Sequence, residues 1–291
     1  FSTTTMASST TSPTDSTMAR IVNRFRLKPS SNMTMAAPIS SEMAWAKSSV
    51  RSRIRPCTRV SSSALRCGEL TDQAHRFANA LRAQGFEPES RVMIAMLDTL
   101  EWPVVFLGCI LAGVVPIAAN TLLTTKDFEF MLRDSRARAL FVSKPLLPVF
   151  EPLIGKIGTL RTVFVAGDDA PNSVAALVKG ASTETRVADT CSDDACFWLY
   201  SSGSTGTPKG TVHLHSHLVL TAELYGRAVL GMREDDVVFS AAKLFFAYGL
   251  GNALTFPLSV GATTVLLPTR PTPADVFGVM KKFRPTIFCG V

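Results

Sequence analysis

Hydrophobic residues recur at helical spacing soon after the first fifth of the chain. Leu70, Ala74, Phe77 and Leu81 follow one another at intervals of three and four positions, which places them on one face of a helix. Gly85 stands just beyond this run, where glycine commonly ends a helix because it tolerates the left-handed conformation. This segment is therefore predicted to be an amphipathic helix.

Short apolar runs alternate with further helical patterns along the rest of the chain. Their length and composition predict strands at residues 91–96, 114–117, 139–143, 162–166, 196–201, 237–241, 263–267 and 286–290. Helices are predicted at residues 102–112, 124–134, 215–231 and 274–283. The second of these helices opens with Thr124 and Asp127, a pair that resembles a capping box. Strands alternating with helices favour an α/β fold with a largely parallel sheet.

Residues 102–123 form the longest uncharged apolar stretch. Pro103, Gly113 and Pro116 interrupt it, whereas a membrane-spanning helix needs about 20 mostly apolar residues without such breaks. We therefore expect a buried helix followed by a buried strand, and no membrane partner.

Residues 1–63 differ from the rest in composition. They contain fifteen Ser and nine Thr without sustained apolar periodicity, so they cannot bury enough surface to offset the entropy of ordering. We interpret them as a leader that is either disordered or an artefact of the gene sequence. A targeting segment is the alternative, because mitochondrial transit peptides are also rich in Ser and Arg and poor in acids. Residues 64–291 are then the globular part.

The net charge of +7 belongs to this leader. It holds nine Lys or Arg and two acids out of totals of 30 and 23, which leaves 21 of each in residues 64–291. The globular part is neutral, so no nucleic-acid partner is expected. The six cysteines show neither CxxC nor zinc-finger spacing. Scattered thiols are typical of a reducing compartment, so a cytoplasmic location is expected.

The strongest chemical signal is YSSGSTGTPKG at residues 200–210, directly after the apolar run CFWLY. Its glycines let backbone amides approach a polyphosphate, its hydroxyls donate hydrogen bonds, and Lys209 adds a positive charge. It is not a Walker A motif, because Pro208 stands where that pattern has glycine and Gly210 follows the lysine. We expect a strand-to-helix loop that binds a nucleoside triphosphate.

These residues resemble the phosphate-binding signature of the AMP-forming acyl-CoA synthetases, the adenylate-forming superfamily. In LFFAYG, Phe246 stands where most members have His, and this variant is similar to the benzoate–CoA ligase branch. Residues 92–125 and 197–213 resemble that branch as well, so the likeness covers about residues 65–291. The implied fold is α/β: an incomplete large N-terminal domain of the adenylate-forming (AMP-binding) fold, with mixed or parallel sheets flanked by helices, and no C-terminal domain.

The resemblance implies a two-step ligase reaction. AMP is transferred from ATP to a benzoate-type aromatic carboxylate, and the thiol of CoA then displaces AMP to form a thioester. Phosphate binding is implied for Ser201, Ser202, Gly203, Ser204, Thr205, Gly206, Thr207 and Lys209. The catalytic lysine, the residue that supports Mg²⁺ and much of the CoA contact are implied in segments that this chain lacks. The chain alone is therefore expected to be inactive.

The aryl pocket is implied at Phe246, Ala247, Tyr248 and Gly249. A flat aromatic cleft suits a benzoate ring, and the pocket role is favoured for Ala247 and Tyr248. Plain core packing is the alternative for Phe245, Phe246 and Tyr248. Lys243 precedes this segment and is either a surface charge or a group on the substrate side.

Three alternating histidines follow the glycine-rich segment. His213, His215 and His217 could share one face of a strand and bind a metal. No acid or cysteine nearby completes a ligand set, and the segment is predicted to enter a helix. No metal site is therefore expected in this chain. The alternatives to an aryl-CoA ligase are an acyl-CoA ligase for another carboxylate and a non-catalytic nucleotide-binding protein.

Overall fold

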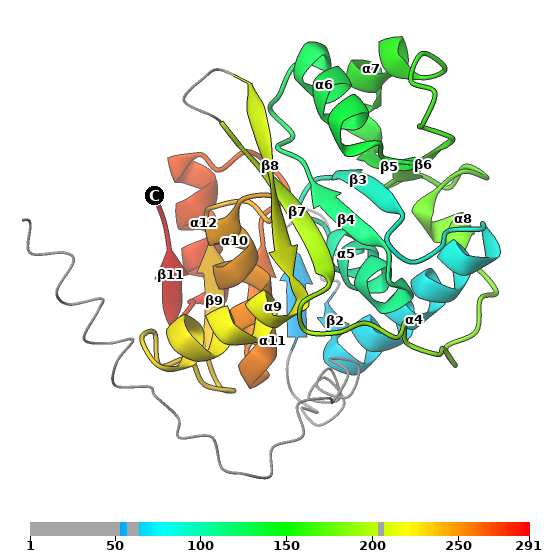
Figure 1. Ribbon diagram of the computed structural model, residues 1–291. Coiled ribbons are helices and arrows are strands. Elements are labelled where there is room, and N and C mark those ends of the chain that lie inside the picture. The colour runs from blue at the N-terminus through cyan, green and yellow to red at the C-terminus, as the bar shows by residue number, and fades with distance from the viewer. Residues whose placement is uncertain (1–52, 57–63, 203–206) are drawn as a thin grey trace, which may run out of the picture. The chain divides into compact units, whose positions relative to one another are not determined.

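The computed structural model describes residues 53–56, 64–202 and 207–291, which form two β-sheets with helices packed on them (Figure 1). One sheet has the strand order β6-β5-β3-β4-β7-β8 and the other has the order β11-β9-β10-β1-β2. All strand pairs are parallel except those of β8 with β7 and of β2 with β1. The predicted α/β fold with a mainly parallel sheet is confirmed.

The six-stranded sheet contains most of the buried strands that the sequence predicts. Its strands are β3 (Arg91–Ala95), β4 (Val115–Ala118), β5 (Ala139–Ser143), β6 (Thr162–Ala166), β7 (Ala195–Ser202) and β8 (Pro208–Leu214). Its helices are α4 (Cys67–Ala83), α5 (Glu101–Ala112), α6 (Thr125–Ser135), α7 (Leu147–Phe150) and α8 (Val174–Val178), with 3₁₀ turns η1 (Lys144–Leu146) and η2 (Glu151–Leu153).

The inner strand β3 is buried on both faces of this sheet. Along β3, Val92 and Ile94 belong to the core on the side of α4 and α5, whereas Met93 and Ala95 belong to the core on the side of α6 and α7. Successive side chains of a strand point to opposite faces, so a strand covered on both sides is a continuous apolar run. This burial explains why β3 is apolar at every position after Arg91.

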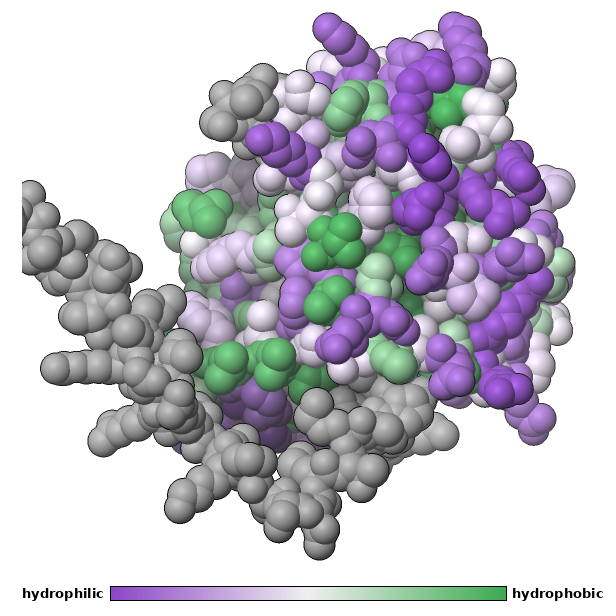
Figure 2. All heavy atoms as spheres, in the orientation of Figure 1, coloured by the Kyte–Doolittle hydropathy of each residue, from purple (hydrophilic) through white to green (hydrophobic). Residues whose placement is uncertain are grey.

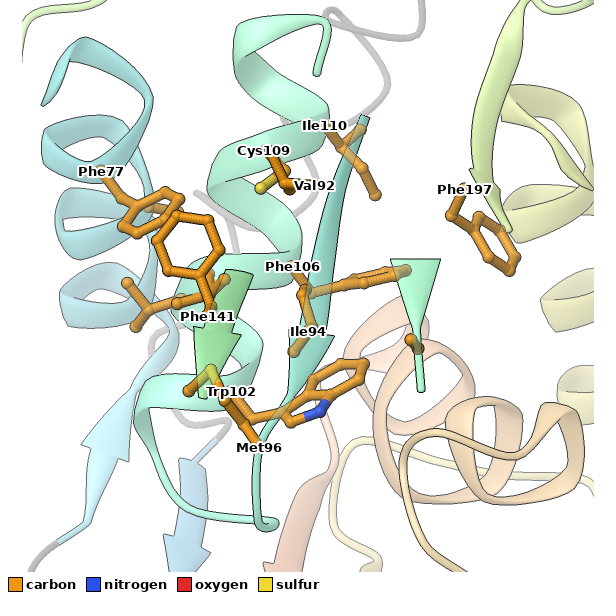
Figure 3. Close-up of a cluster of buried hydrophobic side chains, with 14 of the residues drawn as sticks. Phe77, Val92, Ile94, Met96, Trp102, Phe106, Cys109, Ile110, Phe141 and Phe197 are labelled. Carbon is orange, nitrogen blue, oxygen red and sulfur yellow. The ribbon is translucent and has the colours of Figure 1, made fainter. Parts of the chain in front are cut away.

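Aromatic rings fill the core beneath α4 and α5 (Figure 3). The ring centroids of Trp102 and Phe106 lie 5.0 Å apart, and Phe106 meets Phe197 of β7 edge-on at 5.5 Å. The two helices approach closely because α5 carries Gly108, where a Cβ would lie 2.7 Å from Cδ1 of Phe77 in α4. The aromatic core thus fixes α5, and with it the loop that leads into α5 from β3.

The five-stranded sheet joins three strands from the last part of the chain to two short strands that precede α4. Its strands are β1 (Arg53–Pro56), β2 (Leu65–Arg66), β9 (Val237–Ser240), β10 (Thr263–Leu266) and β11 (Ile287–Cys289). Its helices are α9 (His215–Thr221), α10 (Ala247–Leu250), α11 (Phe256–Val260) and α12 (Pro273–Phe283), with π-helical turns η3 (Ala222–Arg227) and η4 (Gly251–Thr255). Val238 packs towards η3 and α11, while Phe239 packs towards α12.

The strand β1 lies inside the segment that the sequence analysis assigns to the leader. It pairs in parallel with β10, with Ile54 opposite Thr264, and it pairs antiparallel with β2. The remainder of residues 1–63 lies outside the described residues. The boundary at residue 64 stays a prediction.

The glycine-rich segment does not connect a strand to a helix, so that prediction is wrong. Residues 208–214 form β8, which runs antiparallel to β7 with Ser201 opposite Lys209 and Trp198 opposite Val212. The helix α9 begins only at His215. The physical reason is the close packing of Gly210 against the rings of Trp198 and Tyr200, each 3.2 Å from the position of a Cβ. This contact keeps β8 close to β7.

The helix predicted at residues 215–231 is shorter and less regular than expected. After α9 the chain widens into η3, and the N–H of Leu230 donates to the carbonyl of Tyr225 (2.9 Å). A Cβ on Gly226 would lie 2.9 Å from Cβ of Phe256, and this close contact keeps the turn against α11. Figure 2 shows hydrophobic residues gathered over α9 and η3. Leu220 of α9 and Leu224 of η3 are exposed.

The apolar stretch at residues 102–123 forms α5 and then β4, as predicted. Among the described residues, no helix has both the length and the apolar character needed to cross a membrane.

Candidate functional site

The strands of both sheets end around one cavity of about 670 Å³. Its lining residues come from the segments that follow β3, β4, β5, β9 and β10, together with the last residue of the chain. They are Leu97, Asp98, Thr121, Leu122, Leu146, Ala241, Ala242, Lys243, Phe245, Phe246, Ala247, Tyr248, Pro268, Arg270, Pro271 and Val291. Ligands of parallel α/β sheets bind outside the carboxyl ends of the strands, so the cavity has the position expected of a binding site.

The predicted aryl segment contributes one wall of this cavity. Phe246, Ala247 and Tyr248 line it, at the start of α10. The side chains of Phe246 and Tyr248 are 45% and 42% exposed, whereas Phe245 is buried with its ring centroid 4.6 Å from that of Phe246. The hydroxyl of Tyr248 donates to the carbonyl of Gly290 (3.4 Å). Rings that served only in core packing would be buried. These half-exposed rings beside a cavity are therefore available to contact a ligand.

Gly249 is not among the residues that line the cavity. It is buried in α10, and a Cβ on it would lie 2.0 Å from the carbonyl oxygen of Lys243. Gly249 therefore contributes to the backbone packing behind the aryl wall, the part of the cavity lining formed by Phe246, Ala247 and Tyr248.

An ion pair that the sequence analysis did not predict lies in the cavity wall. Nζ of Lys243 lies 3.8 Å from Oδ2 of Asp98, and the two side chains are only 14% and 5% exposed. Burial raises the pKa of Asp98 to about 7, against the opposing effects of Lys243 and the N–H of Leu244. Burial likewise lowers the pKa of Lys243, and Asp98 opposes that shift. Lys243 is thus a largely buried cation paired with Asp98 and not a surface charge.

The hairpin of β7 and β8 reaches the same edge of the six-stranded sheet as the cavity. The strand β7 is parallel to β4, so the carboxyl end of β7 lies on the side where Thr121 and Leu122 follow β4. Ser201, Thr207 and Lys209 are exposed at this end of the hairpin. The phosphate-loop residues Gly203, Ser204, Thr205 and Gly206 lie outside the described residues, as does the side chain of Ser202.

Two contacts of β7 hold the hairpin in place. The hydroxyl of Tyr200 donates to Oδ2 of Asp134 in α6 (2.5 Å), and the guanidinium of Arg91 lies 5.7 Å from the ring centre of Trp198. Burial, followed by the contact with Asp134, raises the pKa of Tyr200. The strands beneath the predicted loop are thus anchored to the rest of the sheet.

The three histidines hold the junction between β8 and α9. His213 stacks on Phe197 with ring centroids 4.6 Å apart, and its Nδ1 lies 3.4 Å from Nδ1 of His217. The N–H of Leu214 donates to the same Nδ1 of His217 (3.2 Å), while His215 is buried. Burial lowers the pKa of both His213 and His215. These contacts are structural, and the described residues include no group of three or more His, Cys, Asp or Glu that could hold a metal ion.

Comparison with known proteins gives the class to which this fold and cavity belong. The sequence model of the family described as "AMP-binding enzyme" matches residues 48–291. The chain belongs to this family of AMP-binding enzymes.

Several similar proteins are named as ligases of aromatic acids. The chain is 57% identical over 224 residues to a benzoate–CoA ligase of Thauera aromatica, a match that covers 77% of this chain and 42% of the relative. A solved benzoate CoA ligase from Burkholderia xenovorans LB400 superposes with a TM-score of 0.79 at 43% identity, over 87% of this chain and 50% of that one. The anthranilate CoA ligase AuaEII, solved with anthranoyl-AMP, superposes with a TM-score of 0.82 at 32% identity, over 89% and 50%. The chain thus spans half or less of the length of these relatives.

Proposed function

We propose that this chain is the ATP- and aryl-binding part of an aryl-carboxylate–CoA ligase whose acid is benzoate or a substituted benzoate. The observation that carries the proposal is the aromatic-lined cavity at the sheet edge that the β7–β8 hairpin also reaches. The 57% identity to a benzoate–CoA ligase and the likeness to a ligase solved with anthranoyl-AMP support the aryl acid and the acyl-adenylate.

The proposed chemistry begins with activation of the acid. A carboxylate oxygen attacks the α-phosphorus of ATP, the bond to the bridging oxygen breaks, and pyrophosphate leaves with its charge. Preorganised donors that neutralise this charge lower the barrier. We assign this role to Ser201, Thr207, Lys209 and the loop between them. The thiol of CoA then attacks the acyl carbon and displaces AMP.

The small-molecule partners that follow are an aromatic carboxylate, ATP and CoA. Phe246, Ala247 and Tyr248 would contact the ring, because flat apolar walls suit a planar ring. Mg²⁺ would accompany ATP, but the described residues hold no cluster suited to a metal, so we assign it no ligand in this chain. The free thiols of Cys109 and Cys196 support a cytoplasmic setting.

Calorimetric titration of the 291-residue chain tests the acid specificity. We expect 4-fluorobenzoate and benzoate to bind more tightly than hexanoate, and the variant Tyr248→Ala to lose most of that preference. Leu220→Ala, on the exposed surface of α9, is the matched control and is expected to bind as the wild type does. Tighter binding of hexanoate than of benzoate would contradict the aryl assignment.

A further inference from the structure

The Asp98–Lys243 pair connects segments that belong to different sheets. Asp98 follows β3 of the six-stranded sheet, while Lys243 follows β9 of the five-stranded sheet. Both oxygens of Asp98 also accept from the backbone N–H of Leu244, each at 3.3 Å. Leu244 itself is fully buried in the core that contains Trp102. The start of the aryl segment is therefore fixed to the neighbouring sheet by side chain and backbone together.

The ammonium group of Lys243 makes its contacts within the protein. It donates to the carbonyls of Leu267 and Thr269, the second at 2.6 Å, and Oδ2 of Asp98 lies within ion-pair distance at 3.8 Å. Lys243 thus joins the ends of β9 and β10 and faces Asp98 from there.

The position of the pair relates it directly to the aryl wall. Lys243 and Tyr248 are five positions apart in the sequence. Between them the N–H of Phe246 donates to the carbonyl of Lys243 (3.0 Å). The Gly249 backbone packs against that same carbonyl. Any displacement of Lys243 would therefore move the residues that face the cavity.

Resting on the proposed function, we propose that Asp98 and Lys243 are positioning residues for aryl recognition: their buried pair holds the Phe245–Tyr248 wall in its ring-binding arrangement before the acid arrives. A preformed wall favours a rigid planar ring over a flexible chain, because no ordering free energy has to be spent on binding. The pair thus affects the selectivity of the cavity for aromatic acids as well as the stability of the fold.

The test compares two ligands on the 291-residue chain at about pH 8, by ¹⁹F NMR and calorimetry with 4-fluorobenzoate and by calorimetry with hexanoate. Asp98→Asn removes one charge with little change of shape, and Lys243→Met removes the other. In each variant we expect about a tenfold loss of affinity for 4-fluorobenzoate, equivalent to ~1.4 kcal/mol, with a much smaller change for hexanoate. Asp168→Asn, which breaks the exposed Lys144–Asp168 pair, is the matched control and should leave both affinities unchanged.

The ratio of the two affinities separates positioning from stability. A purely structural role would lower the folded fraction, so both ligands would lose affinity in proportion. Such a proportional loss, or wild-type affinity for 4-fluorobenzoate in both variants, would overturn the positioning role. If the wild type itself fails to bind 4-fluorobenzoate, the proposed function fails and this proposal fails with it.

Two further measurements cover variants that fail to fold. The double variant Asp98→Asn/Lys243→Met leaves neither buried charge without its partner, and we expect it to fold and to discriminate less than the wild type. A folded double variant with wild-type selectivity would contradict the proposal. Hydrogen exchange on the wild type adds an independent check: the amide of Leu244 should be protected before ligand is added, and rapid exchange there would show that the wall is not preformed.

Discussion

Gly249 lies so close to Lys243 that a methyl group on its Cα would sit 2.0 Å from the carbonyl oxygen of that lysine. Side-chain atoms cannot approach an oxygen this closely, and the obstacle here is backbone, which cannot rotate away. The contact holds α10 against the segment that follows β9, directly behind the aryl wall. The glycine is thus required by packing rather than by contact with a ligand.

The variant Gly249→Ala should therefore be strongly destabilised. We expect the free energy of unfolding to fall by about 2–4 kcal/mol, because the backbone must shift to admit the methyl group. Urea unfolding followed by circular dichroism measures the change. Gly278→Ala in α12 is the control, since nothing lies within 4 Å of its Cβ position, and it should gain about 0.5–1 kcal/mol of stability. Equal midpoints for the two variants would contradict the packing argument.

Local signals were enough to predict much of the fold. Thr124 and Asp127 form the expected capping box, with the N–H of Thr124 donating to Asp127 (3.0 Å) and the N–H of Asp127 donating back to Thr124 (3.4 Å). Gly85 adopts the expected positive φ of 75° beyond α4. Such features depend on residues that are neighbours in sequence, so the sequence displays them directly.

The features that escaped prediction depend on distant partners. Asp98 accepts from Leu244, 146 positions further along, and nothing near Asp98 in the sequence indicates that contact. The sequence could not decide between two roles for Lys243 for the same reason. The strand β8 was missed because its pairing with β7 depends on Gly210 packing under Trp198. Phe246, Ala247 and Tyr248 line the cavity, whereas Gly249 does not, and their contact with an aryl ring stays a prediction.

Tyr200 should contribute to stability through its bond to Asp134. The bond is 2.5 Å long and its acceptor is a carboxylate, so Tyr200→Phe is expected to lower the free energy of unfolding by about 1–2 kcal/mol. A double-mutant cycle with Asp134→Asn should give a coupling of about 1 kcal/mol. Tyr225→Phe, at a ring that is 42% exposed, serves as the comparison and should change stability little. Additive effects of the two substitutions would show that the bond contributes nothing.

Stability should fall as the pH rises through the ionisation of Asp98. Burial raises its pKa to about 7 from the ordinary 3.8, so between these values the folded chain keeps a proton that the unfolded chain has lost. Raising the pH through this window therefore lowers the free energy of unfolding, by up to about 1.4 kcal/mol per pH unit. The lowered pKa of Lys243 acts with the opposite sign, in the window that ends at its ordinary value of 10.5.

The comparison of wild type with Asp98→Asn isolates this effect. Urea unfolding at about pH 5 and about pH 8 should show the stability of the wild type, relative to the variant, decreasing as the pH rises. A relative stability that stays constant or increases over this range would mean that Asp98 is already ionised at the lower pH.

Lys209 should affect nucleotide binding without affecting the fold. It lies exposed in β8 opposite Ser201, at the end of the hairpin next to the predicted phosphate loop. Under the proposed function its ammonium group meets the phosphates of ATP, and a charge-assisted hydrogen bond of this kind contributes about 1.5–3 kcal/mol. Lys209→Met is therefore expected to weaken ATP binding by about tenfold or more, measured by calorimetry on the 291-residue chain. The free energy of unfolding in urea should stay within about 0.5 kcal/mol of the wild type. Lys209→Arg, which keeps the charge, should retain more of the affinity than the methionine variant.

Lys156→Met is the control: it removes another exposed lysine, before β6, and should bind ATP as the wild type does. Equal weakening by Lys156→Met and Lys209→Met would indicate a general effect of net charge, and the phosphate role of Lys209 would then be wrong.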